Sequence, residues 1–113
     1  MQKQITAKAI QHYAMIAKDR ADIHLDVEVA IQCGYDRPIA HGMYMMGLAQ
    51  SLYIAEHPSQ WITTYAIKFS KPILVNSNVI FHFSVNESRV EVQVLSTDHD
   101  LLLSGHLVVK EIS

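Results

Sequence analysis

The segment from Met43 to Ala55 constrains the fold more than any other, because apolar side chains cover almost all of its surface. Its apolar residues recur on every side of a helix: Met43, Met45, Met46, Leu48, Ala49, Leu52 and Ile54. A helix of this composition has to be covered by other elements on most sides. The rest of the chain is therefore expected to enclose it.

From Trp61 onward the apolar pattern changes to a period of two, which is typical of strands. Four strands are predicted, at residues 61–69, 79–85, 90–94 and 101–109. The last segment is apolar over most of its length, which predicts a strand buried on both faces. The polar clusters at 86–88 and 97–100 favour tight turns, and therefore antiparallel hairpins between the strands that they join.

The N-terminal part of the chain is expected to contain two more helices. Thr6 is a suitable N-cap for a helix over residues 7–17, and a shorter helix over 26–32 would end at Gly34. Residues 19–23 are too polar to continue the apolar face of the first helix, so they are predicted to form a loop.

These elements predict an α+β domain in which an antiparallel sheet wraps around the central apolar helix. Residues 2–5 are expected to add an edge strand. A chain of 113 residues fits a single domain over 1–113. Because a small sheet leaves an edge open, a homodimer is expected.

Composition argues against several kinds of partner. The formal net charge is −2 and there is no basic run, so nucleic acid is not expected to bind. The apolar segment 43–55 is too short to cross a bilayer, so no membrane insertion is expected. Cys33 is the only cysteine, and the first residues lack the apolar region of a signal peptide. A soluble, cytoplasmic protein is the expectation.

Asp19 and His24 form the first candidate for a functional site. They are five positions apart in and beside the predicted loop, so both side chains can reach one pocket. A carboxylate and an imidazole placed in this way can share a water molecule and act as an acid/base pair. The alternative is that Asp19 caps a neighbouring helix and that His24 is an ordinary surface histidine.

Gly42, at the start of the apolar helix, is the second candidate. The first backbone N–H groups of a helix have no intrahelical partner and can bind a developing negative charge on a carbonyl oxygen. The alternative is that Gly42 serves only an unusual backbone angle or close packing. His41 has apolar neighbours in the sequence, which favours a structural role over a third acid/base role.

A metal centre is an alternative for the same residues, with Asp19, His24, His41 and His12 as ligands. Their spacing matches no recognised ligand pattern, and the chain has no cysteine pair. Cys33 has no base beside it in the sequence, so it is not expected to be a nucleophile. We therefore expect neither a metal ion nor a cofactor.

Two motifs together resemble the signature of the MaoC-like hot-dog-fold hydratases, which include R-specific enoyl-CoA hydratases and related 3-hydroxyacyl dehydratases. The family's first motif reads Gly-Asp-x-Asn-Pro-(aliphatic)-His, and Asp19, Ile23, His24 and Asp26 fall in register with it. The second motif, Pro-Ile-(Ala/Val)-His-Gly-Met, matches residues 38–43 without a gap. The resemblance continues to about Lys110, and so covers nearly the whole chain.

The resemblance implies a hot-dog fold and the hydration of a trans-2-enoyl thioester, carried by CoA or by acyl carrier protein. Asp19 and His24 would position and deprotonate the water that adds to C3 and return a proton to C2. The N–H group of Gly42 would polarise the thioester carbonyl. The family works as homodimers and uses no metal. Supporting or substrate-binding roles are implied for His41, Met43, Gln50 and Ser51.

Three positions of the first motif depart from the family pattern. Lys18 stands in place of glycine, Ala21 in place of asparagine and Asp22 in place of proline. This altered loop keeps two other functions open. One is a non-catalytic hot-dog module that binds an acyl thioester, and the other is a hot-dog acyl-CoA thioesterase.

Overall fold

The computed structural model describes residues 1–112, which form four helices and five strands. In chain order the elements are β1 (Gln2–Ile5), α1 (Ala7–Ala17), α2 (Asp22–Leu25), α3 (Val27–Gln32), α4 (Gly42–Glu56), β2 (Gln60–Phe69), β3 (Ser77–Asn86), β4 (Arg89–Ser96) and β5 (Leu101–Glu111). Every helix and strand predicted from the sequence is present, with ends that differ by no more than two residues.

The five strands form one antiparallel sheet in the order β1-β3-β4-β5-β2. The two predicted hairpins, β3–β4 and β4–β5, are confirmed. Glu87 and His99 adopt positive φ angles of 57° and 68° in the turns that close these hairpins. Strand β2 does not pair with β3, the next strand in the chain, but lies at the far edge beside β5.

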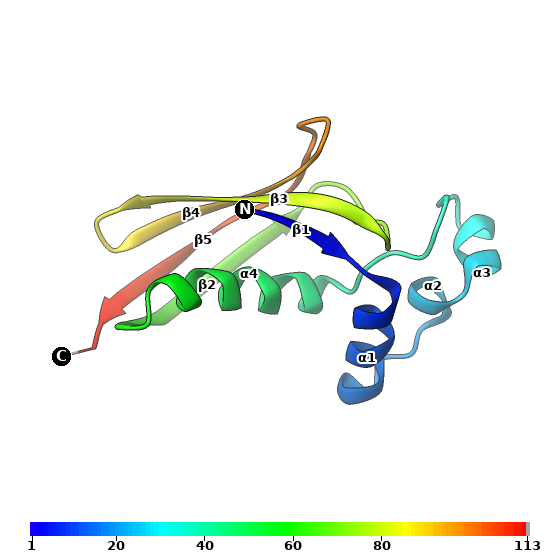
Figure 1. Ribbon diagram of the computed structural model, residues 1–113, viewed down its shortest axis with the longest axis horizontal. Coiled ribbons are helices and arrows are strands. Elements are labelled where there is room, and N and C mark those ends of the chain that lie inside the picture. The colour runs from blue at the N-terminus through cyan, green and yellow to red at the C-terminus, as the bar shows by residue number, and fades with distance from the viewer. Residues whose placement is uncertain (113) are drawn as a thin grey trace.

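Helix α4 lies along one side of the sheet, and the other three helices gather at the end where α4 begins (Figure 1). On α4 the residues Met45, Ala49 and Tyr53 are fully buried, at the spacing of one helical face. They share one apolar core with residues from the inner face of the sheet, including Phe81 and Leu107. The predicted α+β arrangement, a sheet wrapped around a central apolar helix, is confirmed.

The expectation that residues 101–109 are buried on both faces is wrong. Leu103, Leu107 and Val109 are buried in the core that α4 shares, but Ser104 and His106 on the opposite face are only half-buried. Strand β5 is apolar because it lies between β4 and β2 near the middle of the sheet, and no helix of the described residues covers its outer face.

The prediction of a loop over residues 19–23 is also partly wrong, because α2 begins at Asp22. This helix has a single turn, closed by a hydrogen bond of 2.7 Å from the Asp26 N–H to the Asp22 carbonyl. Four residues are too few to show a helical period in the sequence. Asp26 then caps α3, because its Oδ1 atom accepts hydrogen bonds from the Glu28 and Val29 N–H groups.

Tyr65 joins β2 to the central helix through its hydroxyl group, which donates a hydrogen bond of 2.8 Å to the Met46 carbonyl. Burial raises the pKa of Tyr65 from its ordinary value of 10.0 to about 12. The neutral phenol therefore stabilises the folded state fully below pH 10, and this contribution is lost as the pH rises through about 12.

We expect Tyr65→Phe to lower the free energy of unfolding by about 1 kcal/mol at neutral pH, through loss of this hydrogen bond. The variant should also lose less stability than the wild type between pH 10 and 12. Urea unfolding at several pH values measures both effects. Equal losses of stability in the two proteins over that pH range would show that Tyr65 is not the cause of the pH dependence of stability.

Within residues 1–112, no helix is both long enough and apolar enough to span a membrane.

Candidate active site

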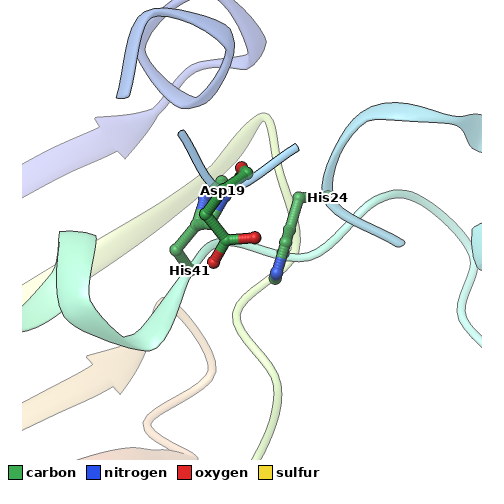
Figure 2. Close-up of side chains that lie close together, drawn as sticks. All are labelled: Asp19, His24 and His41. Carbon is green, nitrogen blue, oxygen red and sulfur yellow. The ribbon is translucent and has the colours of Figure 1, made fainter. Parts of the chain in front are cut away.

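Three side chains from separate segments meet beside the start of α4. Asp19 follows α1, His24 lies on α2, and His41 is the residue before α4. One carboxylate oxygen of Asp19 and one ring nitrogen of each histidine lie within 4.8 Å of one another. Figure 2 shows the Asp19 carboxylate directed towards the His24 ring, with His41 close behind.

The His24 ring is held by a backbone contact that fixes which nitrogen carries the proton. Its Nδ1–H group donates a hydrogen bond of 2.7 Å to the Ile39 carbonyl, because a carbonyl oxygen can only accept. The neutral ring is then left with an unprotonated Nε2 atom, which is the form required of a general base. His24 is half-buried and lines a cavity.

His41 is buried, with 2% of its surface exposed, and contacts both members of the candidate pair. Its Nε2–H group donates a hydrogen bond of 2.9 Å to the backbone carbonyl of Asp19. Its ring stacks on His24 at 3.8 Å between centroids, and Tyr13 packs against His41 at 4.8 Å. The Nδ1 atom of His41 is buried and has no hydrogen-bond partner among the described residues.

The contacts of His41 link it to both members of the candidate pair. Its Nε2–H group holds the Asp19 carbonyl, its ring stacks on His24, and its buried Nδ1 atom has no partner among the described residues. His41 therefore has the geometry of a residue that positions Asp19 and His24.

The backbone of Asp19 is fixed while its carboxylate stays open to solvent. Its N–H group donates to the Ala14 carbonyl at 3.1 Å, and its own carbonyl accepts from His41. The side chain is exposed, and its one hydrogen bond within residues 1–112, from the Ala21 N–H, is long at 3.5 Å. The carboxylate is thus free to bind a water molecule next to His24.

Gly42 opens α4 at the wall of a cavity of about 410 Å³. No side chain of the described residues caps this helix, which leaves its first N–H groups available to a ligand. A Cβ atom on Gly42 would lie 3.1 Å from the tip of the Phe69 ring, so glycine lets this ring pack against the helix start. The cavity is lined by His24, Ile39, Ala40, Gly42, Met45, Phe69, Ser70, Lys71, Pro72 and Ile73.

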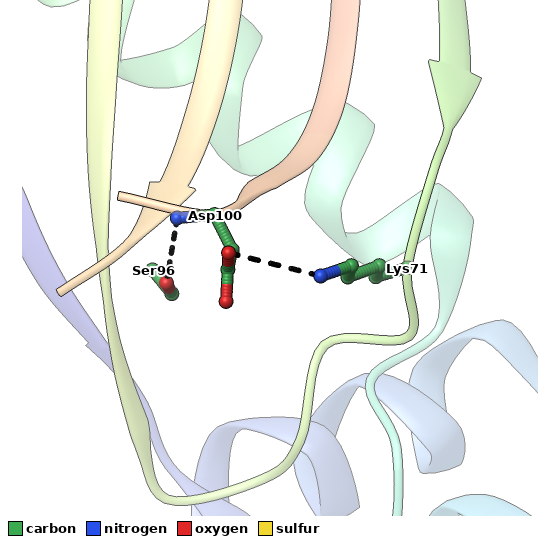
Figure 3. A network of polar contacts seen from close by, with 3 residues as sticks. All are labelled: Lys71, Ser96 and Asp100. Carbon is green, nitrogen blue, oxygen red and sulfur yellow. Dashed lines mark hydrogen bonds and ion pairs between the residues drawn. The ribbon is translucent and has the colours of Figure 1, made fainter. Parts of the chain in front are cut away.

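The cavity has an exposed rim and a buried floor. Residues 69–72 are exposed and form the rim, whereas Met45 and Ile73 are buried, with 1% and 4% of their surfaces accessible. At the rim, the Lys71 ammonium group lies 3.8 Å from the Asp100 carboxylate. Figure 3 shows Asp100 between Lys71 and Ser96, whose hydroxyl oxygen accepts from the Asp100 N–H. Both charges are well exposed, so this pair adds little stability.

The three positions that depart from the resembled motif have clear structural roles. Lys18 ends α1 in the left-handed conformation, at φ 57°, which glycine adopts at lower cost. Ala21 is the N-cap of α2 and makes no side-chain capping bond, whereas asparagine could make one. Asp22 is the first residue of that helix, a position that proline tolerates. Lys18, Ala21 and Asp22 therefore stand at positions that glycine, asparagine and proline would favour.

We expect Lys18→Gly to raise the free energy of unfolding by about 0.5–1 kcal/mol, because it relieves the left-handed backbone. Chemical denaturation measures the change. Lys8→Gly, within the same helix, is the control and should lower stability by about 1 kcal/mol. If Lys18→Gly also lowered the free energy of unfolding, the proposed backbone strain at Lys18 would be contradicted.

The structure does not bring every predicted site residue to this cluster. Met43 is 65% exposed and is not part of the cavity wall, and Gln50 and Ser51 are exposed further along α4. Gln50 is eight residues beyond Gly42, about 12 Å along the helix, and lines a different hollow beside Trp61. Within one chain, neither Gln50 nor Ser51 supports Asp19.

Sequence reasoning missed three residues that shape the site. Ile39 supplies the carbonyl that orients His24, Tyr13 packs on His41, and Phe69 packs on Gly42. Ile39 lies within the second motif, but it acts through its backbone carbonyl. Every residue type has this group, so the sequence gives no signal of the role. Tyr13 and Phe69 come from distant elements, and only tertiary contacts connect them to the site.

The same three side chains are the candidate metal ligands among the described residues, and His12 does not join them. Their ring geometry suits a cation poorly. A histidine lone pair lies in the plane of its ring, and the two rings stack at 3.8 Å with an angle of only 24° between their planes. One cation cannot lie in the planes of both imidazole rings unless one ring turns. The arrangement therefore fits proton transfer better than metal binding.

Comparison with known proteins identifies the family and the fold. The model of the family described as MaoC like domain matches residues 1–102. An (R)-specific enoyl-CoA hydratase of Aeromonas caviae is 24% identical over 119 residues, which cover 97% of this chain and 89% of that protein.

Solved structures show the same fold. An (R)-hydratase of A. caviae involved in PHA biosynthesis has a TM-score of 0.86 at 22% identity, covering 98% of this chain and 91% of that one. An R-hydratase of Pseudomonas aeruginosa has a TM-score of 0.88 at 21% identity, covering 100% and 78%. The fold is the α+β hot-dog fold, and the match over residues 1–102 shows that this chain belongs to the family of MaoC like domains.

Proposed function

We propose that this protein catalyses the reversible hydration of a trans-2-enoyl thioester to the (R)-3-hydroxyacyl thioester. One observation carries the proposal: the His24 ring, whose Nδ1–H group donates to the Ile39 carbonyl, and the Asp19 carboxylate lie together beside a cavity that is also lined by Gly42 at the helix start. The relationship to an (R)-specific enoyl-CoA hydratase supports the same class of reaction.

In the proposed mechanism, the Asp19 carboxylate and His24 Nε2 hold one water molecule between them. His24 takes a proton from this water as its oxygen bonds to C3 of the enoyl group. The electron pair of the C2–C3 double bond moves towards the thioester carbonyl and gives an enolate. The protonated acid/base pair then returns a proton to C2, on the face from which the water attacked, so the overall addition is syn.

The N–H group of Gly42 is the proposed donor to the thioester oxygen. Negative charge develops on this oxygen in the enolate, and an N–H group at the start of a helix stabilises it through the hydrogen bond and the helix dipole. Phe69, packed against Gly42, keeps water away from this oxygen. The apolar floor of the cavity receives the acyl chain.

The direct test follows the loss of enoyl absorbance when the purified chain is mixed with crotonyl-CoA and longer enoyl-CoAs. Loss of absorbance without release of free thiol, monitored with a thiol-reactive dye, supports hydration. Release of thiol would instead identify a thioesterase. Binding seen by calorimetry, with no turnover at any chain length, would identify a non-catalytic acyl-thioester module.

The proposed mechanism uses no metal ion or cofactor. Dialysis against a chelator should therefore leave the hydration rate unchanged. A rate lost on chelation and restored by one divalent cation would assign the Asp19, His24 and His41 cluster to metal binding instead.

The functional unit in this proposal is a homodimer of single-domain chains. Strand β2 is an edge of the sheet, and Trp61 on it is 64% exposed. An open edge with an exposed aromatic side chain favours pairing with a second copy. Light scattering coupled to size-exclusion chromatography should give twice the chain mass of 12.8 kDa, and a monomer mass would contradict the dimer.

A further inference from the structure

The peptide unit between Ile39 and Ala40 is held from both sides. Its carbonyl oxygen accepts the hydrogen bond of 2.7 Å from His24 Nδ1. Its N–H group, which belongs to Ala40, donates a hydrogen bond of 2.7 Å to the Ile73 carbonyl. A peptide unit is planar and trans, so its N–H and C=O groups point in opposite directions and cannot turn separately. The partner of the N–H group therefore also decides where the carbonyl oxygen meets His24.

The connection that carries Ile73 continues this pairing for two more residues. Ile39 forms an antiparallel bridge with Leu74, and the Val75 N–H group donates a hydrogen bond of 2.8 Å to the Pro38 carbonyl. In a regular antiparallel pairing, the residues at 38 and 75 would exchange two hydrogen bonds. Proline has no N–H group, so the second bond, to the Val75 carbonyl, cannot come from the backbone of residue 38.

The side chain of Arg37 supplies the missing donor. Its Nε–H group donates a hydrogen bond of 2.8 Å to the Val75 carbonyl, although most of this side chain is exposed. The contact lies close to the candidate base, because Arg37, Val75 and His24 all line one small cavity of about 180 Å³. Arg37 thus completes the pairing at the point where proline interrupts it.

We propose that Arg37 is a positioning residue, which holds residues 73–75 in register and thereby directs the Ile39 carbonyl to His24. The inference rests on the proposed hydratase function and adds a residue that orients its base. Arg37 acts through the backbone of two segments and touches neither the substrate nor the reacting atoms in this role.

The experiment compares Arg37→Met with Arg37→Gln, because the two side chains differ at the position of Nε. Glutamine has an amide nitrogen at the same place along the side chain and can still donate, whereas methionine has a methyl group there. With crotonyl-CoA, Arg37→Met should lower kcat about tenfold with little change in KM, since the base is misplaced while the cavity remains. Arg37→Gln should recover most of that loss. Both variants remove the positive charge, so equally slow variants would assign the effect to charge and overturn the proposal.

A second pair of variants restores the backbone donor. Pro38→Ala provides an N–H group opposite the Val75 carbonyl, so adding Arg37→Met in that background should cost less than about threefold in kcat. Arg89 is the matched control, because its Nε–H group also donates, to Glu91 on β4, and it does not line the cavity. Arg89→Met should keep the wild-type kcat, and a tenfold loss there would overturn the assignment to the Arg37 contact.

Nitrogen-15 NMR of the full chain tests the geometry without relying on activity or on a folded Arg37→Met. In the wild type, His24 should carry its proton on Nδ1, and the loss of this signal in His24→Asn assigns it. The Arg37 Nε–H group should exchange with solvent more slowly than that of the exposed Arg20. A folded Arg37→Met should show a mixture of the two His24 tautomers, and Arg37→Gln should show the wild-type form.

Equal exchange at Arg37 and Arg20 would overturn the proposal. So would a folded Arg37→Met that is less stable but keeps the wild-type kcat and the wild-type His24 signal, because Arg37 would then only stabilise the fold. A wild type that hydrates no enoyl-CoA would refute the hydratase function itself. The NMR comparison would still decide in that case whether Arg37 orients His24.

Discussion

Replacing His24 with alanine or asparagine is expected to lower the rate of enoyl-CoA hydration by about a thousandfold, the usual loss when a general acid/base is removed. Alanine removes both ring nitrogens. Asparagine can still donate a hydrogen bond from the place of Nδ1, so the contact with the Ile39 carbonyl is kept while Nε2 is lost. Equal losses in the two variants would show that Nε2 is the atom that matters.

Asp19→Asn should cause a loss of similar size, because a neutral amide lacks the negative charge with which the carboxylate orients the water and stabilises the protonated His24 ring. The Asp19 side chain is exposed and makes one long hydrogen bond, so the fold should be unaffected. Steady-state rates with crotonyl-CoA measure the effect, and circular dichroism checks the fold. Asp22→Asn and His12→Asn, both at exposed positions outside the cluster, are the matched controls and should keep wild-type rates.

The assignment of Asp19 and His24 would fail if their variants kept wild-type rates. It would also fail if the two control variants lost as much activity, since the losses would then reflect the charge or stability of the whole region. A double variant should be little slower than either single variant, because the two residues act on one water molecule.

The second large effect is expected at His41, where activity and stability should change in opposite directions. His41→Phe keeps an aromatic ring between His24 and Tyr13 but removes the hydrogen bond to the Asp19 carbonyl. Without this bond the Asp19 backbone is held only by its N–H contact with the Ala14 carbonyl, and we expect kcat to fall about tenfold to a hundredfold with little change in KM.

The free energy of unfolding should not fall in the same variant. The lost hydrogen bond is worth about 1 kcal/mol. The substitution also removes the buried Nδ1 atom that lacks a partner, and this relieves a cost of about 1–3 kcal/mol. Chemical denaturation and steady-state kinetics on one preparation test whether kcat falls while the free energy of unfolding does not. A purely structural His41 would show lower stability with an unchanged kcat, which is the opposite outcome.

Local sequence patterns predicted most of the elements of this fold. The all-round apolar segment at 43–55 and the period of two after Trp61 depend on neighbours in the chain, and these neighbours decide helix and strand. The same approach failed where an element was too short to show a period, as in α2. It also failed for β5, where burial depends on which face the central helix covers.

The candidate residues Asp19, His24 and Gly42 were also selected from the sequence alone, because two short motifs hold them at fixed spacing. Only the tertiary structure decided how they are arranged. The stack of His41 on His24 joins segments 17 residues apart, and the packing of Phe69 on Gly42 joins segments 27 residues apart. The pairing of β2 with β5 and the position of Met45 in the cavity wall depend equally on distant contacts. A sequence pattern records the chemistry of each residue and its near neighbours, whereas the packing of distant segments sets how those groups face one another.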